Sequence, residues 1–279
     1  MKILFRFIGR SFLVSAILLA LMAQPALAAL RTWTAAAMTS EWNNSGNWDL
    51  GSPTSGDDAL IPGGASPYPE ILSGDFVLVW NVTVQNGGSV SVSGGDFYAA
   101  GKLVVENGGA FLLNSGNVTV EDSFQGLEIA VDGSFQMNNG TLAIGFSSFP
   151  GKLTYNGDFQ FNGGFIDAAP SSSLGGTGTF SWSDGQIRDV FSSTGFSWVN
   201  AGTIQIQTGG SPAMGDCDFT NDNAFILEPG SGLLVSDSTS TGVTRFENGI
   251  NGTLEGNGFI DFAPSNPGVT NTRLTNNGM

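Results

Sequence analysis

Short alternations of apolar and polar residues recur through most of the chain. Clear examples are segments 81–84 (NVTV), 102–106 (KLVVE), 126–131 (GLEIAV), 140–144 (GTLAI) and 202–207 (GTIQIQ). An apolar residue at every second position is typical of a strand with one buried face. No segment after residue 28 keeps the i, i+3, i+4 spacing of a helix. The pattern therefore predicts an all-β chain of many short strands.

The strands come with an eight-residue pattern that has Gly first, an apolar residue third or fifth, and Asn, Asp or Gly last. GSFQMNNG begins at Gly133, GDFQFNGG at Gly157 and GTFSWSDG at Gly178. Looser copies begin at Gly74, Gly95, Gly116, Gly195, Cys217 and Gly242, so the nine starts are on average 21 residues apart.

A period of about 21 residues predicts a parallel β-solenoid, because one coil of this size cannot bury its own apolar face and must stack on its neighbours. Nine coils about 4.8 Å apart would form a rod about 45 Å long. We expect Phe135, Phe159 and Phe180 to stack inside it. Amide ladders are expected at Asn86 with Asn107 and at Asn138 with Asn162. The alternative is an antiparallel β-sandwich with similar strand spacing.

Residues 29–72 differ from the repeats that fill 73–279. They carry Trp33, Trp42 and Trp48. The first coil of a solenoid has an open edge that invites aggregation unless it is covered. We therefore expect this region to form an N-terminal cap, with sugar stacking by the tryptophans as the alternative. The chain ends in TNNGM, where a new coil would open, so we expect the repeats to be truncated at the C-terminus.

Residues 1–28 have the layout of a secretory signal peptide. Lys2, Arg6 and Arg10 precede an apolar run, and ALA at 26–28 offers a cleavage site after Ala28. The sequence has no second hydrophobic span, so no membrane span is predicted in the mature chain.

The charge of the chain narrows the choice of partners. Without the signal segment, six Lys and Arg remain against 24 Asp and Glu, which disfavours nucleic acid as a partner. Only 12% of residues are charged and 41% are hydrophobic, so the chain should fold. The absence of His and the presence of one Cys exclude His-based catalysis and an internal disulfide.

The opening TW…EWNNSGNWD…GDDALIP, followed by VTVQNGGSVSVSGG, resembles the start of bacterial secreted β-helical surface proteins. These include autotransporter-passenger-like and adhesin-like chains. The resemblance implies a right-handed parallel β-helix at the outer cell surface or released from it. Its partners would be extracellular polysaccharide or a host or cell surface. The chain lacks the NPNG element of two-partner secretion domains.

The best candidate for a metal site is GDCDFTNDNAF, where Asp216, Asp218 and Asp222 are close in sequence and could bind calcium weakly. The EF-hand pattern fails, because its sixth position is Asn221 and its twelfth is Leu227. Aligned with the repeat, Asp218 and Phe219 fall where Asp158 and Phe159 stand, and Phe225 where Phe165 stands. We therefore attribute this acidity to the repeat and predict no metal site.

Carboxylate pairs could support an enzyme. Asp75 and Asp96 are 21 residues apart and would stack on adjacent coils, and Asp158 and Asp184 form a second candidate pair. A repeat with Asp at its turns produces such pairs by default, and the remaining cations are scattered singly. Arg188, beside Asp184 and Asp189, is expected in a surface ion pair.

The sequence therefore predicts a secreted or cell-surface rod for display, adhesion or matrix structure. No catalytic residue, metal or cofactor is assigned. The alternative is a carbohydrate-active β-helix enzyme, either a polysaccharide lyase or a glycosidase.

Overall fold

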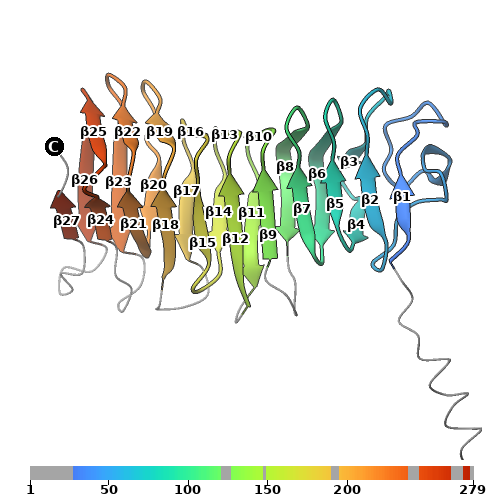
Figure 1. The fold of residues 1–279 in the computed structure, drawn as a ribbon, viewed down its shortest axis with the longest axis horizontal. Helices are drawn as coiled ribbons and strands as arrows, with labels where there is room; N and C mark the ends of the chain where they lie inside the picture. The colour runs from blue at the N-terminus through green and yellow to red at the C-terminus, as the bar shows by residue number, and fades with distance from the viewer. Residues whose placement is uncertain are drawn as a thin grey trace, which may run out of the picture.

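The computed structural model describes residues 28–120, 127–146, 149–189, 195–237, 245–264 and 273–276. Their strands wind into a rod of stacked coils that runs from the Trp-rich region at one end to the last strands at the other (Figure 1). The predicted all-β parallel solenoid is confirmed. The only helical turn among the described residues is the short 3-10 helix η1 (Ser45–Asn47).

The strands of successive coils stack into three parallel faces. Among the residues that the structure describes, face 1 has eleven strands, which corresponds to about 48 Å of stacking at ~4.8 Å per step and agrees with the predicted length. Its strands are β1 (Leu30–Thr32), β2 (Asp58–Ile61), β5 (Val82–Val84), β7 (Lys102–Val105), β9 (Leu127–Val131), β12 (Phe149–Tyr155), β15 (Ser173–Gly176), β18 (Phe196–Asn200), β21 (Cys217–Asn221), β24 (Arg245–Asn248) and β27 (Arg273–Asn276).

Faces 2 and 3 share the long strands β6 (Ser89–Ala99) and β8 (Ala110–Val120), whose pairing is interrupted at the corner between the two faces. Face 2 also has β3 (Glu70–Leu72), β10 (Ser134–Met137), β13 (Asp158–Phe161), β16 (Thr179–Trp182), β19 (Thr203–Ile206), β22 (Ala224–Leu227) and β25 (Thr253–Gly256). Face 3 also has β4 (Phe76–Val79), β11 (Thr141–Phe146), β14 (Phe165–Ala168), β17 (Gln186–Asp189), β20 (Ala213–Gly215), β23 (Gly232–Asp237) and β26 (Phe259–Pro264).

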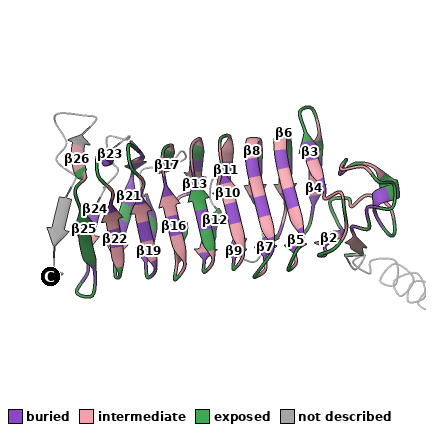
Figure 2. Cartoon of the chain, turned by 90° about the horizontal axis from the view of Figure 1, so that it is seen from above, coloured by how far each residue is buried: buried purple, intermediate pink, exposed green. Residues whose placement is uncertain are grey.

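The interior of the rod is filled by the apolar residue at every second strand position, which produces the alternating buried and intermediate bands of Figure 2. The predicted stack of Phe135, Phe159 and Phe180 is confirmed. The ring centroids of Phe135 and Phe159 are 4.8 Å apart, and those of Phe159 and Phe180 are 4.9 Å apart. All three rings are fully buried, and each contributes ~1.5–3 kcal/mol through burial.

Amide side chains form a second column where face 2 ends. Asn162 donates a 2.9 Å hydrogen bond to Asn138, and Asn138 donates one of 2.9 Å to Asn114. The ladder predicted at Asn138 and Asn162 is therefore confirmed. The ladder predicted at Asn86 and Asn107 is not formed, because the Asn86 side chain lies over Gly108 instead.

Glycine serves two different purposes at the corners. At Gly157 the backbone of the previous coil is so close that an added Cβ would lie 2.0 Å from the carbonyl oxygen of Gly133. At Gly164 the backbone has a φ of 92°, which side chains disfavour. The close approach of the neighbouring backbone therefore requires glycine at the corner before face 2, and the positive φ favours glycine at the corner before face 3.

The structure corrects the assignment of six repeat copies. The octets that begin at Gly74, Gly95 and Gly116 lead into strands of face 3. The octets that begin at Gly195 and Cys217 lie on face 1, as do residues 245–248 of the octet that begins at Gly242, whereas those at Gly133, Gly157 and Gly178 lie on face 2. The error arose because every face uses the same alternating pattern after a corner. The actual advance per coil varies: Phe159 follows its partner Phe135 by 24 residues, and Phe180 follows Phe159 by 21.

Candidate functional site

The three tryptophans of the N-terminal region pack against one another. Trp48 lies 5.1 Å from Trp33 and 4.9 Å from Trp42 between ring centroids, and Trp42 lies 5.7 Å from Phe97. At most 4% of any of these three side chains is exposed, which leaves no ring face for a sugar. This packing extends the aromatic column of the core and supports the cap interpretation, which stays a prediction.

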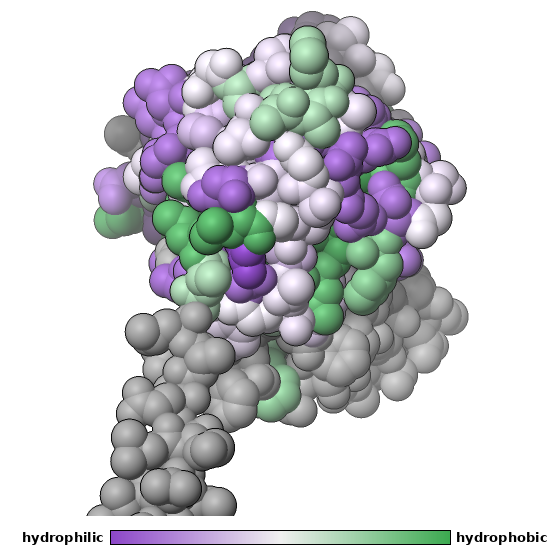
Figure 3. Space-filling view, turned by 90° about the vertical axis from the view of Figure 1, so that its right-hand side faces the viewer, coloured by the Kyte–Doolittle hydropathy of each residue, from purple (hydrophilic) through white to green (hydrophobic). Residues whose placement is uncertain are grey.

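The surface of this end of the rod is mixed. Figure 3 shows hydrophilic and hydrophobic residues intermingled there. Apolar side chains that are exposed in the region include Leu30, Met38 and Leu50. They are separated by polar residues in the sequence, so they do not by themselves define a binding site.

Asp216, Asp218 and Asp222 are spread along the whole length of strand β21. Asp216, which is buried, immediately precedes the strand, and Asp222 immediately follows it. Six residues of extended chain separate their backbones by about 20 Å. Asp218 points outward and binds Arg245, with 2.8 Å between Oδ1 and Nε. In the part of the chain that the structure describes, no three acidic, Cys or His side chains could hold a metal ion together.

The alignment of these residues with face 2 is wrong. Asp218 and Phe219 pair with Ser197 and Trp198 on face 1, not with the coils that carry Asp158 and Phe159. Phe225 lies on face 2, whereas Phe165 lies on face 3. The acidity of this stretch is therefore not a copy of the polar corner at Asp158.

Asp75 and Asp96 do not form the predicted pair. Asp96 is opposite Phe76, one position beyond Asp75. Asp75 accepts hydrogen bonds from the Leu72 backbone at 2.9 Å and from Asn43 at 3.2 Å. Asp96 accepts one of 2.7 Å from Asn117. Both carboxylates therefore have structural partners.

Asp158 and Asp184 lie at opposite ends of face 2. Asp158 is in register with Thr179, and Asp184 lies five residues after Thr179, about 16 Å along an extended strand. This separation exceeds the ~5–10 Å that paired glycosidase carboxylates use.

Arg188 forms the expected ion pair, but with the carboxylate of Asp167 on the preceding coil. The Nε atom lies 2.8 Å from Asp167 Oδ1. The guanidinium carbon lies 4.0 Å from the ring centroid of Phe165. These two contacts hold the charged end of Arg188 over β14.

The cations are less scattered than the sequence indicates. Lys102, Lys152 and Arg245 occupy outward positions on face 1, and Arg273 is in register with Arg245. Lys102 and Lys152 are both in register with Glu128, and Arg245 binds Asp218. Opposite charges are therefore neighbours at two places on face 1, whereas Ser173 and Ser197 separate them and Arg273 is in register with Arg245.

Two carboxyl groups are held in the charged form by hydrogen bonds. Although burial raises it, the pKa of Asp57 lies below its usual value because Thr54 donates two hydrogen bonds and Arg31 is nearby. Two hydrogen bonds from Thr208 lower the pKa of Glu228. A general acid near neutral pH needs a pKa shift in the opposite direction.

A buried amide ladder was not predicted from the sequence. Asn200, Asn221 and Asn248 end three successive strands of face 1. Asn200 donates to Asn221 and Asn221 donates to Asn248, both at 2.7 Å. Each Asn stands two residues after a buried ring, as in WVN, FTN and FEN. This recurring triplet is the signal that could have revealed the ladder.

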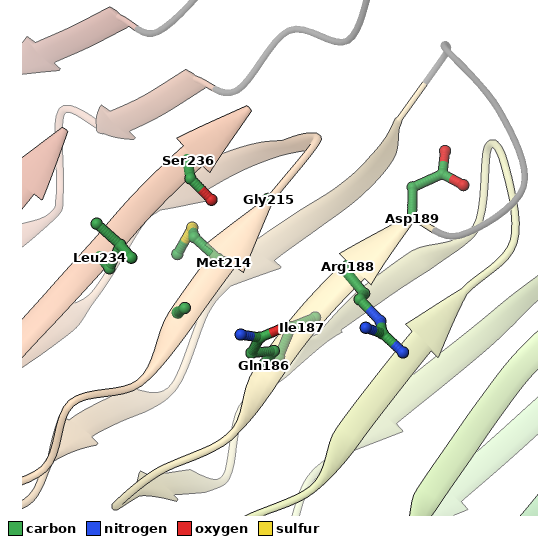
Figure 4. Close-up of a pocket in the computed structure, with 9 residues that line it drawn as sticks. Gln186, Ile187, Arg188, Asp189, Met214, Gly215, Leu234 and Ser236 are labelled. Carbon is green, nitrogen blue, oxygen red and sulfur yellow. The ribbon is translucent and has the colours of Figure 1, made fainter. Parts of the chain in front are cut away.

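A surface hollow on face 3 was also missed. Its volume is about 330 Å³, which is within the range of small-ligand sites. It lies over β20 between β17 and β23 (Figure 4), and its lining includes Gln186, Arg188, Ala213, Gly215, Leu234 and Ser236. In the sequence, the small residues Ala213 and Gly215 are the feature that could have indicated this hollow. Only the strand register shows that both lie between larger outward residues of β17 and β23.

None of the helical structure among the described residues is long and apolar enough to cross a membrane. The signal segment predicted at 1–28 lies outside the described residues except for Ala28.

The architecture agrees with the stacked coils implied by the resemblance to β-helical surface proteins, although the right-handed winding stays a prediction. Comparison with known protein families, with characterised proteins and with solved structures found no match to this chain.

Proposed function

We propose that this chain is the rod of a bacterial secreted or cell-surface protein that acts in display, adhesion or matrix structure without catalysis. The observation that carries the proposal is the unbroken stack of eleven parallel strands on face 1, with a continuous aromatic core beneath it. Such a scaffold presents three long faces at fixed spacing.

The placement of the charged groups supports a non-catalytic role. The candidate pair Asp75 and Asp96 is out of register, and Asp158 and Asp184 are far apart along the strand. Arg188 is already bound to Asp167. A polysaccharide lyase or glycosidase needs an acid and a base that converge on one substrate bond.

The N-terminal pattern and the charge support an extracellular location. A basic start, an apolar run and ALA at 26–28 are typical of export. The single cysteine, Cys217, is buried, so exposure to an oxidising compartment would leave the described fold unchanged.

The test is to express the full chain in a secreting bacterial host and to identify the mature N-terminus by mass spectrometry. We expect export and cleavage after Ala28. The purified protein is then incubated with pectin, alginate, xylan and β-glucan, and new chain ends are measured. We expect no cleavage. Retention in the cytoplasm with an intact N-terminus would overturn the location, and cleavage that copurifies with the protein would overturn the non-catalytic role.

A further inference from the structure

We propose that the hollow over β20 on face 3 binds a short stretch of a neutral oligosaccharide. This inference rests on the proposed function as a surface rod and names the chemistry of a ligand for it. It follows from the shape of the hollow, from the direction of Arg188 and from the side chains that line the hollow.

The hollow exists because β20 carries small outward residues between two strands with larger ones. Ala213 is in register with Gln186 on one side and Leu234 on the other. Gly215 is likewise flanked by Arg188 and Ser236. The backbones of the two flanking strands are therefore two strand spacings apart, or about 9.6 Å. The space left between their side chains runs parallel to the strands, as an extended sugar chain would.

The charge of Arg188 is compensated outside the hollow. Its guanidinium lies toward β14 (Figure 4). There it binds Asp167 at 2.8 Å and covers the ring of Phe165. Only its aliphatic stem then contributes to the wall. Because the chain as a whole has a net charge of −15, a polyanion would be repelled. An uncharged ligand meets no such penalty.

The lining has the mixture that a sugar requires. Gln186 provides an amide that can both donate and accept hydrogen bonds from hydroxyl groups. Leu234, which is 38% exposed, offers an apolar surface to the C–H face of a ring. A ligand therefore finds polar and apolar contacts on opposite walls of the same hollow.

The hollow continues toward the end of the rod. A second hollow of about 220 Å³ shares Leu234 and adds Pro212, Phe259 and Asp261. The Phe259 side chain is 61% exposed and lies over Gly232, which places an aromatic face beside the shared Leu234. Two adjoining hollows fit an oligosaccharide of several units better than a single sugar.

The test uses a substitution that fills the hollow with a larger outward side chain and leaves the buried core residues unchanged. Ala213→Gln places at 213 the residue that already stands in register at 186. The matched control is Ala143→Gln, an outward position on face 3 that lies outside both hollows. Leu234→Ser is a second variant, which removes the apolar wall. Circular dichroism and thermal melting confirm that each variant folds.

Binding is measured by isothermal titration calorimetry with cellohexaose, laminarihexaose and xylohexaose, and with hexagalacturonate as the anionic comparison. We expect at least one neutral hexasaccharide to bind. Its Kd should rise at least about tenfold in Ala213→Gln and in Leu234→Ser, and should stay within about twofold in Ala143→Gln.

Failure of all three neutral probes to bind would overturn the inference, as would equal binding by wild type and Ala213→Gln or a preference for hexagalacturonate. An exported, non-cleaving protein that binds none of the neutral probes would leave the proposed function standing, so the two failures are distinguishable.

Discussion

Replacing Asn221 by Asp should make the stability of the rod depend strongly on pH. Asn221 is fully buried. Its Oδ1 accepts a 2.7 Å hydrogen bond from Asn200, and its Nδ2 donates to Asn248 Oδ1 at 2.7 Å and to the Thr253 carbonyl at 2.9 Å. The Thr253 carbonyl can only accept, which fixes the direction of the amide. An ionised carboxylate would place an oxygen against these two acceptors.

The magnitude follows from proton linkage. A neutral Asp can donate one proton, so one acceptor loses its partner at a cost of about 1–3 kcal/mol. Burial among acceptors raises the pKa of the new carboxyl, whereas in the unfolded chain it stays near ~3.9. The folded state then keeps a proton that the unfolded state releases. Stability should therefore fall as pH rises above about 4, by about 1.4 kcal/mol per pH unit until the folded-state pKa is reached.

The assay is urea denaturation of wild type and Asn221→Asp from about pH 4 to 7, followed by circular dichroism and tryptophan fluorescence. The matched control is Asn162→Asp in the outer ladder, where the side chain is half-buried and bonded to Asn138. We expect a much smaller pH dependence there, because water can solvate the charge. A stability difference between wild type and Asn221→Asp that does not change with pH would refute the reasoning.

Three further predictions concern buried groups. Phe159→Ala should lower the free energy of unfolding by about 3–5 kcal/mol because the ring is fully buried between two others, and Phe159→Leu by less than half of that; a loss below about 1 kcal/mol for Ala in urea denaturation would contradict the packing. Burial, and then the negative charges of Asp218 and Asp216, raise the pKa of the Cys217 thiol. Iodoacetamide in mildly alkaline buffer should therefore label it only after denaturant is added, and rapid labelling of the native protein would be the contrary result. Burial also raises the pKa of Tyr155, so the folded state keeps its proton as pH rises past ~10, where the unfolded chain ionises. The melting temperature should then fall above that pH, and less steeply in Tyr155→Phe; equal slopes in the two proteins would argue against this.

The central part of the core could be predicted from the sequence. Phe135, Phe159 and Phe180 stand at the same position of three consecutive octets, and all three octets occupy face 2. The bond between Asn138 and Asn162 was predictable for the same reason. Where consecutive copies belong to one face, the local pattern and the three-dimensional register agree.

The remaining assignments needed the structure. The octet at Gly195 resembles its predecessors because any strand that follows a corner has a small residue and then alternating apolar residues. The glycine and the alternating apolar residues of an octet do not distinguish face 1 from face 2, and advances of both 21 and 24 residues occur between paired positions. The hollow over Ala213 depends on outward residues of three separate coils, so no single stretch of sequence contains it.

Between two central coils, paired positions are separated by the same number of residues on all three faces. This equality makes the length of the rod adjustable. Leu153 pairs with Leu174, Phe159 with Phe180 and Ile166 with Ile187, which is a step of 21 residues on every face. Removing residues 157–177 would join Asn156 to Gly178 and bring Phe180 onto Phe135, Gln186 onto Thr141 and Trp198 onto Leu153. Every ladder would close again, with both ends of the molecule unchanged. A gene encoding such a rod can thus alter the distance between its ends by in-frame loss or duplication of one unit, with the backbone ladders of all three faces kept in register.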